Sequence, residues 1–186
     1  MKGIQHIFNK KKILIYGLGK TGLSSYLFLK KNNKIFFYDD NKKTIKDKRI
    51  KKSFIKKKNI FKKEFDFILI SPGIDRKKCH LKNLIKKNLN KVISDLDVFY
   101  THYFKNTNIT ITGTNGKSTT CELLAHILKK NKLRYCLGGN IGKPILECKN
   151  FQNGYVIIEA SSFQLYYSQY ICPDYALFLN FANDHL

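Results

Sequence analysis

The alternation of short β-branched runs with amphipathic stretches predicts an α/β protein with parallel sheets. Two glycine-containing loops sharpen this prediction. The sequence GLGKTG occupies residues 17–22, and GTNGKST occupies residues 113–119. Each loop lies between an expected strand and an expected helix, the setting in which Rossmann-like and P-loop domains bind nucleotides. We therefore expect a Rossmann-like domain followed by a P-loop domain.

The first unit is a strand at residues 13–16, the glycine turn and a helix that ends near Asn32. We expect the helix to have one apolar face, formed by Leu23, Tyr26, Leu27 and Lys30. A second strand at 35–38 ends in Asp39 and Asp40, about 20 residues after the turn, which completes a G-x-G-x-x-G fingerprint with its acid. NAD is the default ligand of such a turn, but another dinucleotide or a UDP-like ligand fits equally well.

The rest of the first half continues the alternation. Residues 41–64 are rich in lysine and predict a solvated loop with one short amphipathic element. A buried strand at 65–70 is followed by the turn Ser71-Pro72-Gly73-Ile74, at the strand end where open α/β sheets bind ligands. A helix over 81–89 and a short strand at 92–93 complete this half.

The second half opens with a β-branched strand at 109–112, followed by the phosphate loop. Its leading glycine lies three positions before Gly116, two fewer than in the usual motif. The tail of the motif is intact: Lys117 can reach the β- and γ-phosphates, and Ser118 or Thr119 can bind magnesium. The helix that follows should bury the side chains of Leu123, Leu124, Ile127 and Leu128.

Two later strands bring further polar groups to the same sheet edge. A strand at 155–158 ends in Glu159, a position suited to a magnesium ligand or a group that orients water. A strand at 176–179 is followed by a loop that contains His185, which can reach the same cleft.

The charge is unusual and unevenly distributed. The 186 residues carry a formal net charge of +22, and all but three of the 35 basic residues are lysine. Base readout favours arginine, and residues with A/T-rich codons make up just over half of the chain, so codon bias explains the lysines better than a nucleic-acid partner. Residues 1–105 hold 28 basic and 8 acidic side chains, whereas 106–186 hold 7 and 5. This shift predicts domains at 1–105 and 106–186.

Five widely spaced cysteines without a C-x-x-C pair indicate neither a disulfide framework nor a zinc site, so we expect reduced thiols. No signal-peptide pattern and no apolar run of membrane-spanning length is present. These features predict a cytoplasmic protein without membrane insertion.

Several long motifs, taken in order, resemble the Mur ligases of peptidoglycan synthesis. They are ITGTNGKST at 111–119, GGNIG at 138–142, EASSFQL at 159–165 and NFANDHL at 180–186. The turns GLGKTG at 17–22 and SPGI at 71–74 are most similar to the branch of the family that adds D-glutamate. Folylpolyglutamate synthases share the phosphate loop, but the unit at 13–40 argues against them. Two further hypotheses are a nucleotide-binding remnant without catalysis and an NAD-dependent oxidoreductase.

The resemblance implies two substrate sites. The N-terminal domain would bind the UDP of UDP-N-acetylmuramoyl-L-alanine. Lys20 and Thr21 would lie near the uracil, Asp39 and Asp40 near the uridine, and Ser71 and Gly73 at the pyrophosphate, with Gly19 also in this site. Asn140, Ser161 and His185 would approach the muramoyl-alanine end. The ATP site would comprise Gly113, Thr114, Asn115, Gly116, Lys117, Ser118, Thr119 and Thr120. Magnesium would bind Ser118 and Glu159, with a second ion near His185, and Lys117, Glu159 and His185 would be the catalytic residues.

The implied chemistry is ATP-dependent amide formation. ATP would phosphorylate the alanyl carboxylate to an acyl phosphate, which the amine of D-glutamate would attack, while Lys117 and metal ions neutralise the phosphoryl charge. The family continues beyond DHL with more of the central domain and an amino-acid-binding domain. We therefore expect 106–186 to be a truncated P-loop domain, the chain alone to lack ligase activity, and a separate chain to be a possible source of the missing part.

Overall fold

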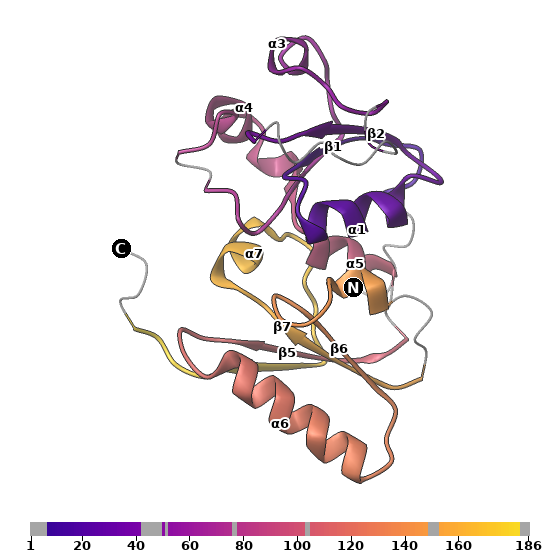
Figure 1. The fold of residues 1–186 in the computed structure, drawn as a ribbon, viewed down its shortest axis with the longest axis vertical. Helices are drawn as coiled ribbons and strands as arrows, with labels where there is room; N and C mark the ends of the chain where they lie inside the picture. Colours follow the sequence, from indigo (N-terminus) through magenta and orange to yellow (C-terminus); the bar gives the residue numbers. More distant parts are fainter. Residues whose placement is uncertain are drawn as a thin grey trace.

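The computed structural model describes residues 7–41, 50, 52–75, 78–102, 105–148 and 153–182. Within these residues the chain forms two parallel sheets, one from the first half and one from the second (Figure 1). The α/β class with parallel sheets, expected from the alternation of strand and helix patterns, is confirmed.

The first sheet has the order β2-β1-β3-β4. Its strands are β1 (Lys12–Tyr16), β2 (Lys34–Tyr38), β3 (Phe67–Ile70) and β4 (Val92–Ile93). Strand β1 pairs in parallel with β2 through Ile15 and Phe37, and with β3 through Ile15 and Leu69. The associated helices are α1 (Lys20–Leu29), α3 (Lys57–Ile60), α4 (Lys82–Lys87) and the 3₁₀ turn η2 (Leu89–Lys91). Because all strands are parallel, the loops after β1, β2 and β3 meet at one edge.

The second sheet has the order β6-β7-β5-β8. Its strands are β5 (Thr107–Thr112), β6 (Tyr135–Gly139), β7 (Tyr155–Glu159) and β8 (Tyr175–Phe178). The helices of this half are α6 (Lys117–Lys130), η3 (Ile145–Cys148) and α7 (Ser162–Tyr167). Strand β5 lies centrally between β7 and β8, so the phosphate loop at its end is flanked by the ends of both neighbours.

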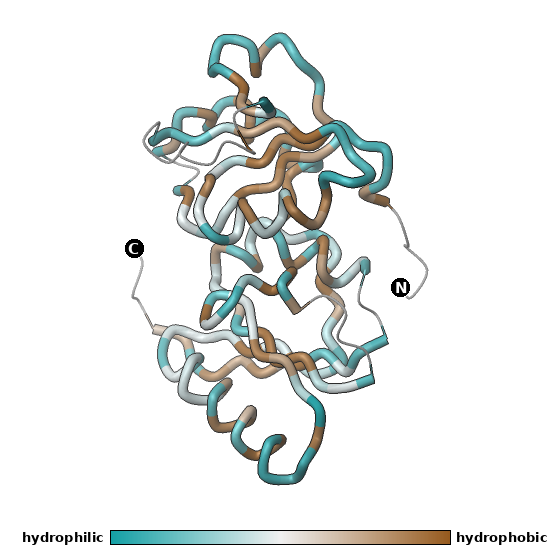
Figure 2. Tube along the Cα trace, turned by 45° about the vertical axis from the view of Figure 1, so that its right-hand side comes forward, coloured by the Kyte–Doolittle hydropathy of each residue, from teal (hydrophilic) through white to brown (hydrophobic). Residues whose placement is uncertain are grey.

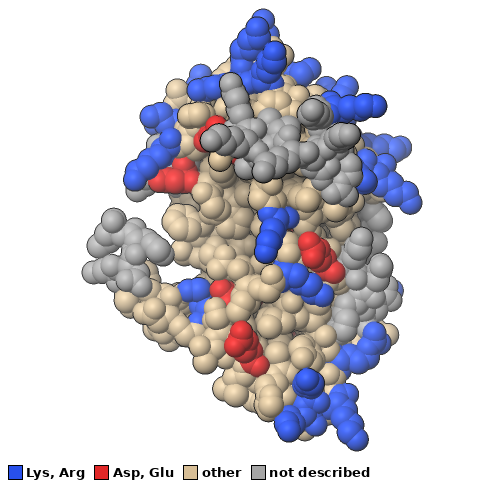
Figure 3. All heavy atoms as spheres, in the orientation of Figure 1, with Lys and Arg blue, Asp and Glu red and all other residues tan. Residues whose placement is uncertain are grey.

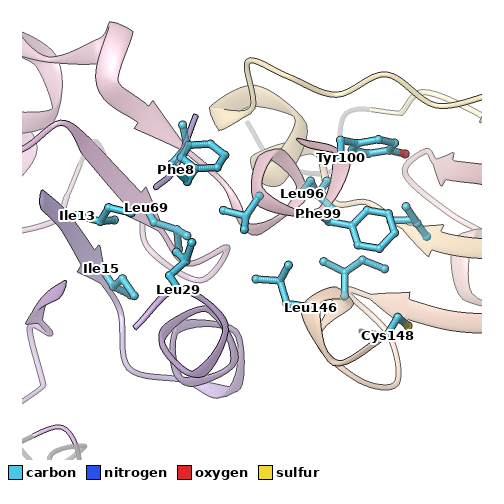
Figure 4. Close-up of a cluster of buried hydrophobic side chains, with 14 of the residues drawn as sticks. Phe8, Ile13, Ile15, Leu29, Leu69, Leu96, Phe99, Tyr100, Leu146 and Cys148 are labelled. Atoms are coloured by element: carbon cyan, nitrogen blue, oxygen red, sulfur yellow. The ribbon is translucent and has the colours of Figure 1, made fainter. Parts of the chain in front are cut away.

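A shared apolar cluster joins the two sheets. It combines residues of the first sheet, such as Ile15 and Leu69, with Leu96 and Phe99 of helix α5 (Asp95–His102) and Leu146 of η3 (Figure 4). Figure 2 shows hydrophobic stretches in both sheets and hydrophilic ones at the outer helices. Helix α5 is therefore buried between the sheets, which explains why the sequence alternation did not reveal it.

Two expected helix faces are wrong in detail. Helix α1 buries Gly22, Ser24 and Ser25 with Leu29, whereas Leu27 is 40% exposed. Helix α6 buries Cys121, Ala125 and Leu128, whereas Leu123 and Ile127 are exposed. In both helices small side chains face the sheet, because they let the helix backbone approach the strands closely.

Residues 41–64 are only partly a solvated loop. Among those described, Phe54 bridges to Phe37, and Ile55 and Ile60 are buried on either side of the start of α3. The short element expected in this lysine-rich stretch is therefore α3, anchored by two apolar side chains.

The expectation of unpaired cysteines is wrong for Cys136 and Cys148, which form a disulfide. They are 12 positions apart in sequence, but β6 and η3 bring their Cα atoms to 6.3 Å. Cys79, Cys121 and Cys172 are not disulfide-bonded.

On the face shown in Figure 3, Lys and Arg side chains are spread mostly over the two ends of the molecule. No helix among the described residues is both long and apolar enough to cross a bilayer.

Candidate functional site

The phosphate loop after β5 has a backbone that only glycine adopts readily at two points. Gly113 has φ +146° and Gly116, the N-cap of α6, has φ +82°. A Cβ atom at Gly113 would also lie 3.1 Å from the backbone N of Asn180. The loop is thus turned sharply over the start of a 14-residue helix, whose N-terminal N–H groups favour an anion.

The Lys117 side chain folds back over the mouth of this loop. Its Nζ donates to the carbonyl oxygens of Gly113, at 2.6 Å, and Thr114, at 2.7 Å. The ammonium is therefore held where a phosphate bound in the loop would meet it.

A buried carboxylate lies beside the loop. Glu159, at the end of β7, is 2% exposed. Its Oε2 accepts from Ser118 Oγ at 2.8 Å, and its Oε1 accepts from Asn140 Nδ2 at 3.1 Å. The strand end that the sequence singled out thus lies next to the hydroxyl group expected to share a metal with it.

The segment after β8 braces the phosphate loop from the other side. Asn115 N donates to Asn180 Oδ1 at 2.9 Å, Asn180 Nδ2 donates back to Asn115 O at 3.0 Å, and Ala182 N donates to Thr114 Oγ1 at 2.9 Å. Asn180 lies in one of the family motifs but is not among the predicted site residues. Its position directly after a strand beside the loop was the available signal.

The first glycine turn is held from two sides. The Asp39 Oδ2 atom accepts from the backbone N of Leu18 at 2.6 Å, and Ser71 Oγ donates to Gly17 O at 3.1 Å. Asp39 and Ser71 thus join the ends of β2 and β3 to the turn after β1. Lys20 and Gly19 are exposed at its rim.

Asp40 is directed away from this turn. Its Oδ2 accepts from Tyr16 Oη at 2.6 Å, and its Oδ1 lies 3.0 Å from His80 Nδ1. Burial, followed by the hydrogen bond to Asp40, raises the pKa of Tyr16. Asp40 is not among the residues that line the nearby cavity.

Two cavities lie between the sheets and share part of their lining. The smaller cavity has a volume of about 290 Å³. It is bounded by residues 17–21 of the first glycine turn and by Asp39, Ser71 and Asn140. The larger, about 770 Å³, is bounded by Gly113, Thr114, Lys117, Ser161 and aromatic side chains of the second half. Pro72, Gly73 and Asn140 line both. The structure thus places the two sequence-predicted loops at two adjacent cavities that share three lining residues.

Helix α7 is anchored to helix α5 beside the larger cavity. Ser161 and Gln164 form a capping box, and Gln164 Nε2 donates to Asp95 Oδ1 at 3.0 Å. The pattern S-x-x-Q at 161–164 was a readable signal for this helix start. Asp95 is 1% exposed, and burial raises its pKa against the opposing effect of the Gln164 hydrogen bond.

Asp97 forms a second link between the halves. Its Oδ1 accepts from the backbone N–H groups of Gln169, at 2.7 Å, and Tyr170, at 2.6 Å, while its Oδ2 accepts from Ser94 N at 2.8 Å. Burial raises the pKa of Asp97 to about 6, although the three N–H donors oppose that rise. No local pattern in the sequence indicates that these two acids lie inside the protein.

The remaining predicted site residues are distributed as follows. Lys20, Thr21 and Gly73 line the smaller cavity with Gly19. Asn115, Gly116, Ser118, Thr119 and Thr120 belong to the phosphate loop or the first turn of α6 but do not line the larger cavity, while His185 lies outside the described residues.

A phosphate loop with a buried carboxylate, adjoining a second glycine-turn cavity, is an arrangement typical of α/β nucleotide-binding proteins. The sequence matches the MurD-like N-terminal domain of Mur ligases over residues 11–93 and the Mur ligase middle domain over residues 111–186. The chain therefore belongs to the Mur ligase family.

Curated relatives support the same assignment. The chain is 39% identical over 184 residues to "UDP-N-acetylmuramoylalanine--D-glutamate ligase" of Rickettsia bellii, a match that covers 97% of this chain and 40% of the relative. It is 41% identical to the protein of that name from Rickettsia felis, over 95% of this chain and 40% of the relative. The chain thus spans about 40% of the length of these relatives.

Solved structures show the same fold at lower identity. A UDP-N-acetylmuramate:L-alanyl-gamma-D-glutamyl-meso-diaminopimelate ligase from Neisseria meningitides superposes with a TM-score of 0.53 at 18% identity, covering 95% of this chain and 62% of that one. A murein peptide ligase from Psychrobacter arcticus gives 0.51 at 17% identity, covering 94% and 44%.

Proposed function

We propose that this chain supplies the sugar-nucleotide and ATP sites of a ligase that joins D-glutamate to UDP-N-acetylmuramoyl-L-alanine. The observation that carries the proposal is the shared wall of the two cavities: Pro72, Gly73 and Asn140 line both. A ligand that lies along this wall reaches from the first glycine turn to the phosphate loop. The substrates in this proposal are those in the names of the curated relatives.

The smaller cavity would take the UDP moiety. The exposed backbone of the glycine turn, Thr21 and Ser71 are hydrogen-bonding groups for a ribose or pyrophosphate, and Lys20 adds a cation at the rim. The Asp39 Oδ2 atom already accepts a hydrogen bond from Leu18 N. Asp39 would therefore hold the turn in place before the ligand binds.

The larger cavity would take the phosphates of ATP. Lys117 Nζ would exchange the carbonyl oxygens of Gly113 and Thr114 for phosphate oxygens, gaining a charge-assisted partner. The N-terminus of α6 would contribute backbone N–H groups, whereas the Thr114 N–H already donates to Asn180 O at 3.1 Å.

The oxygen donors fit magnesium. The Ser118 hydroxyl and the Glu159 carboxylate lie 2.8 Å apart, and Mg²⁺ prefers oxygen ligands from one or two protein groups together with substrate phosphates. These two side chains would hold the ion, which when bound would neutralise charge on the transferring phosphoryl group.

The reaction follows from the weak electrophilicity of a carboxylate. The alanyl carboxylate oxygen would attack the γ-phosphorus of ATP and expel ADP, while Lys117 stabilises the phosphoryl oxygens. The amine of D-glutamate would then attack the acyl carbon, release inorganic phosphate and lose a proton. The chain's own contribution is to position the first two substrates along one wall.

Calorimetric titration of the pure chain tests this proposal. UDP-N-acetylmuramoyl-L-alanine and the Mg²⁺ complex of AMP-PNP should each bind with one site, and NADH should not bind. Lys20→Ala should weaken only the sugar nucleotide, because this side chain lines only the smaller cavity.

Binding of NADH with no heat from the sugar nucleotide would overturn the assignment in favour of an oxidoreductase-like site. Binding of the nucleotide alone, with no response to the sugar nucleotide, would leave a P-loop protein without the proposed substrate.

A further inference from the structure

Asn140 occupies the boundary between the two cavities. It follows β6 directly, in the loop 140–144, and lines both cavities. Its backbone N donates to the carbonyl oxygen of Glu159 at 2.8 Å, and its Nδ2 donates to Glu159 Oε1 at 3.1 Å. One residue of the sugar-nucleotide wall is therefore attached twice to the residue at the end of β7 that faces the phosphate loop.

The backbone holds this loop in place. Gly139 has φ +113°, and a Cβ atom there would lie 2.3 Å from Glu159 O, so the loop backbone lies directly on the end of β7. Gly139 N also donates to Lys143 O at 3.0 Å, which closes the loop on itself. The Asn140 backbone is thus fixed, while its side-chain amide lies at an exposed position, where a change of rotamer can break its hydrogen bond to Glu159 Oε1.

The two oxygens of the Glu159 carboxylate have different partners. Ser118, on the phosphate-loop side, donates to Oε2, and Asn140, on the sugar-nucleotide side, donates to Oε1. An amide donor engaged with one carboxylate oxygen reduces the capacity of that oxygen to bind a cation, because the two compete for the same lone pairs. Withdrawing the Asn140 donor leaves Oε1 of the buried carboxylate without this partner, while Oε2 keeps Ser118, and a cation at Oε1 offsets that loss.

We propose that Asn140 is a positioning residue that couples the two ligand sites through Glu159. A ligand in the smaller cavity that accepts from the Asn140 amide would free Glu159 Oε1 for the magnesium that accompanies the nucleotide. Each ligand would therefore tighten the binding of the other by the same factor, since coupling between two sites is reciprocal. This inference rests on the proposed function and adds to it that each ligand increases the affinity of the other site.

The test is a coupled calorimetric titration. The affinity for the Mg²⁺ complex of AMP-PNP is measured with and without saturating UDP-N-acetylmuramoyl-L-alanine, and again with EDTA in place of Mg²⁺. We expect the sugar nucleotide to raise the affinity for the magnesium complex about fivefold or more, and to leave the metal-free affinity unchanged.

The Asn140→Ala variant tests whether this residue carries the coupling between the two sites. Because the variant leaves Glu159 Oε1 free, it should bind the magnesium complex more tightly than the wild type when no sugar nucleotide is present, and the coupling ratio should fall to about one. Lys143→Ala is the matched control, since it changes an exposed side chain of the same loop and retains the backbone contact. It should keep the wild-type ratio.

A wild-type ratio of one or below, with both ligands binding, would refute the coupling and leave the proposed function standing. An Asn140→Ala variant that keeps the full ratio would refute the role of this residue. If the sugar nucleotide does not bind at all, both the proposed function and the coupling fall together.

Discussion

The two glycine loops of this protein share a strand–turn–helix framework but use their polar groups differently. The first turn directs a carboxylate onto its own backbone, because Asp39 accepts from Leu18 N. The second loop leaves its carboxylate beside a hydroxyl group, Ser118, and places an ammonium over its mouth. The carboxylate of the first loop is thus used to hold the turn, whereas the second loop keeps an ammonium and a carboxylate close to a phosphate cradle.

The loops also differ in how closely their helices pack. A Cβ atom at Gly22 in α1 would lie 1.9 Å from Gly17 O, whereas one at Gly116 would meet only Leu179, at 3.7 Å. The first loop is built for contact between helix and strand, and the second for an open phosphate cradle. The difference shows that a shared motif sets the position of a ligand site and leaves its chemistry to the neighbouring strands.

The largest effect is expected at the closely packed first loop. Gly22→Ala should lower the free energy of unfolding by about 3 kcal/mol, because its new methyl group meets a backbone carbonyl that cannot move aside. Gly19→Ala is the matched control, since no atom lies within 4 Å of its added Cβ. Urea denaturation of both variants measures the difference, and equal midpoints would show that the first helix does not pack as closely as described.

The second region contains the disulfide, between Cys136 and Cys148. Opening the link between residues 12 positions apart should reduce stability by about 3 kcal/mol through the entropy of the unfolded chain. Thiol titration of the denatured protein should find the three cysteines outside the disulfide before reduction and all five after it. Five thiols before reduction would contradict the pairing.

The charge difference between the loops predicts a selective loss of binding. Lys117→Ala should weaken binding of the Mg²⁺ complex of AMP-PNP about 100-fold, because it removes the cation proposed to meet the phosphates directly. Lys20→Ala, the lysine at the matching place in the first loop, should leave this affinity unchanged. Calorimetry measures the affinity of both variants for the Mg²⁺ complex of AMP-PNP. A similar loss of affinity in both would contradict the proposal that only the second loop binds the phosphates of ATP.

The smallest effect concerns the link between the two regions. Because burial raises the pKa of Asp95 in the folded protein, its ionisation opposes folding, and stability present below about pH 4 is lost as the pH rises. Asp95→Asn keeps the acceptor for Gln164 and removes the charge, so its unfolding midpoint should exceed the wild-type value at pH 7 and approach it near pH 4.

Urea denaturation at both pH values provides the measurement, with the exposed Asp75→Asn as control. A difference between Asp95→Asn and wild type that does not vary with pH would show that the Asp95 carboxyl does not change its ionisation on folding.

Much of the fold was readable because its signals are local. The strands β1 and β5, the glycine turns and Glu159 at a strand end each depend on residues adjacent in sequence. The helix faces were not readable in this way, since Ser24, Ser25, Cys121 and Ala125 are buried for their small size and not for their hydrophobicity. Helix α5 escaped detection because it is buried on all sides, so its apolar residues show no one-sided period.

The sequence alone determined the class of fold and the two loops, because β-branched runs, glycine spacing and the GKST tail act through short-range backbone geometry. Only the tertiary structure decided that Asn140 donates to Glu159, that Asp40 pairs with Tyr16 and His80 and does not line the cavity, and that Cys136 meets Cys148. These pairings join residues from different elements, and their partners are set by how strands and helices pack in space.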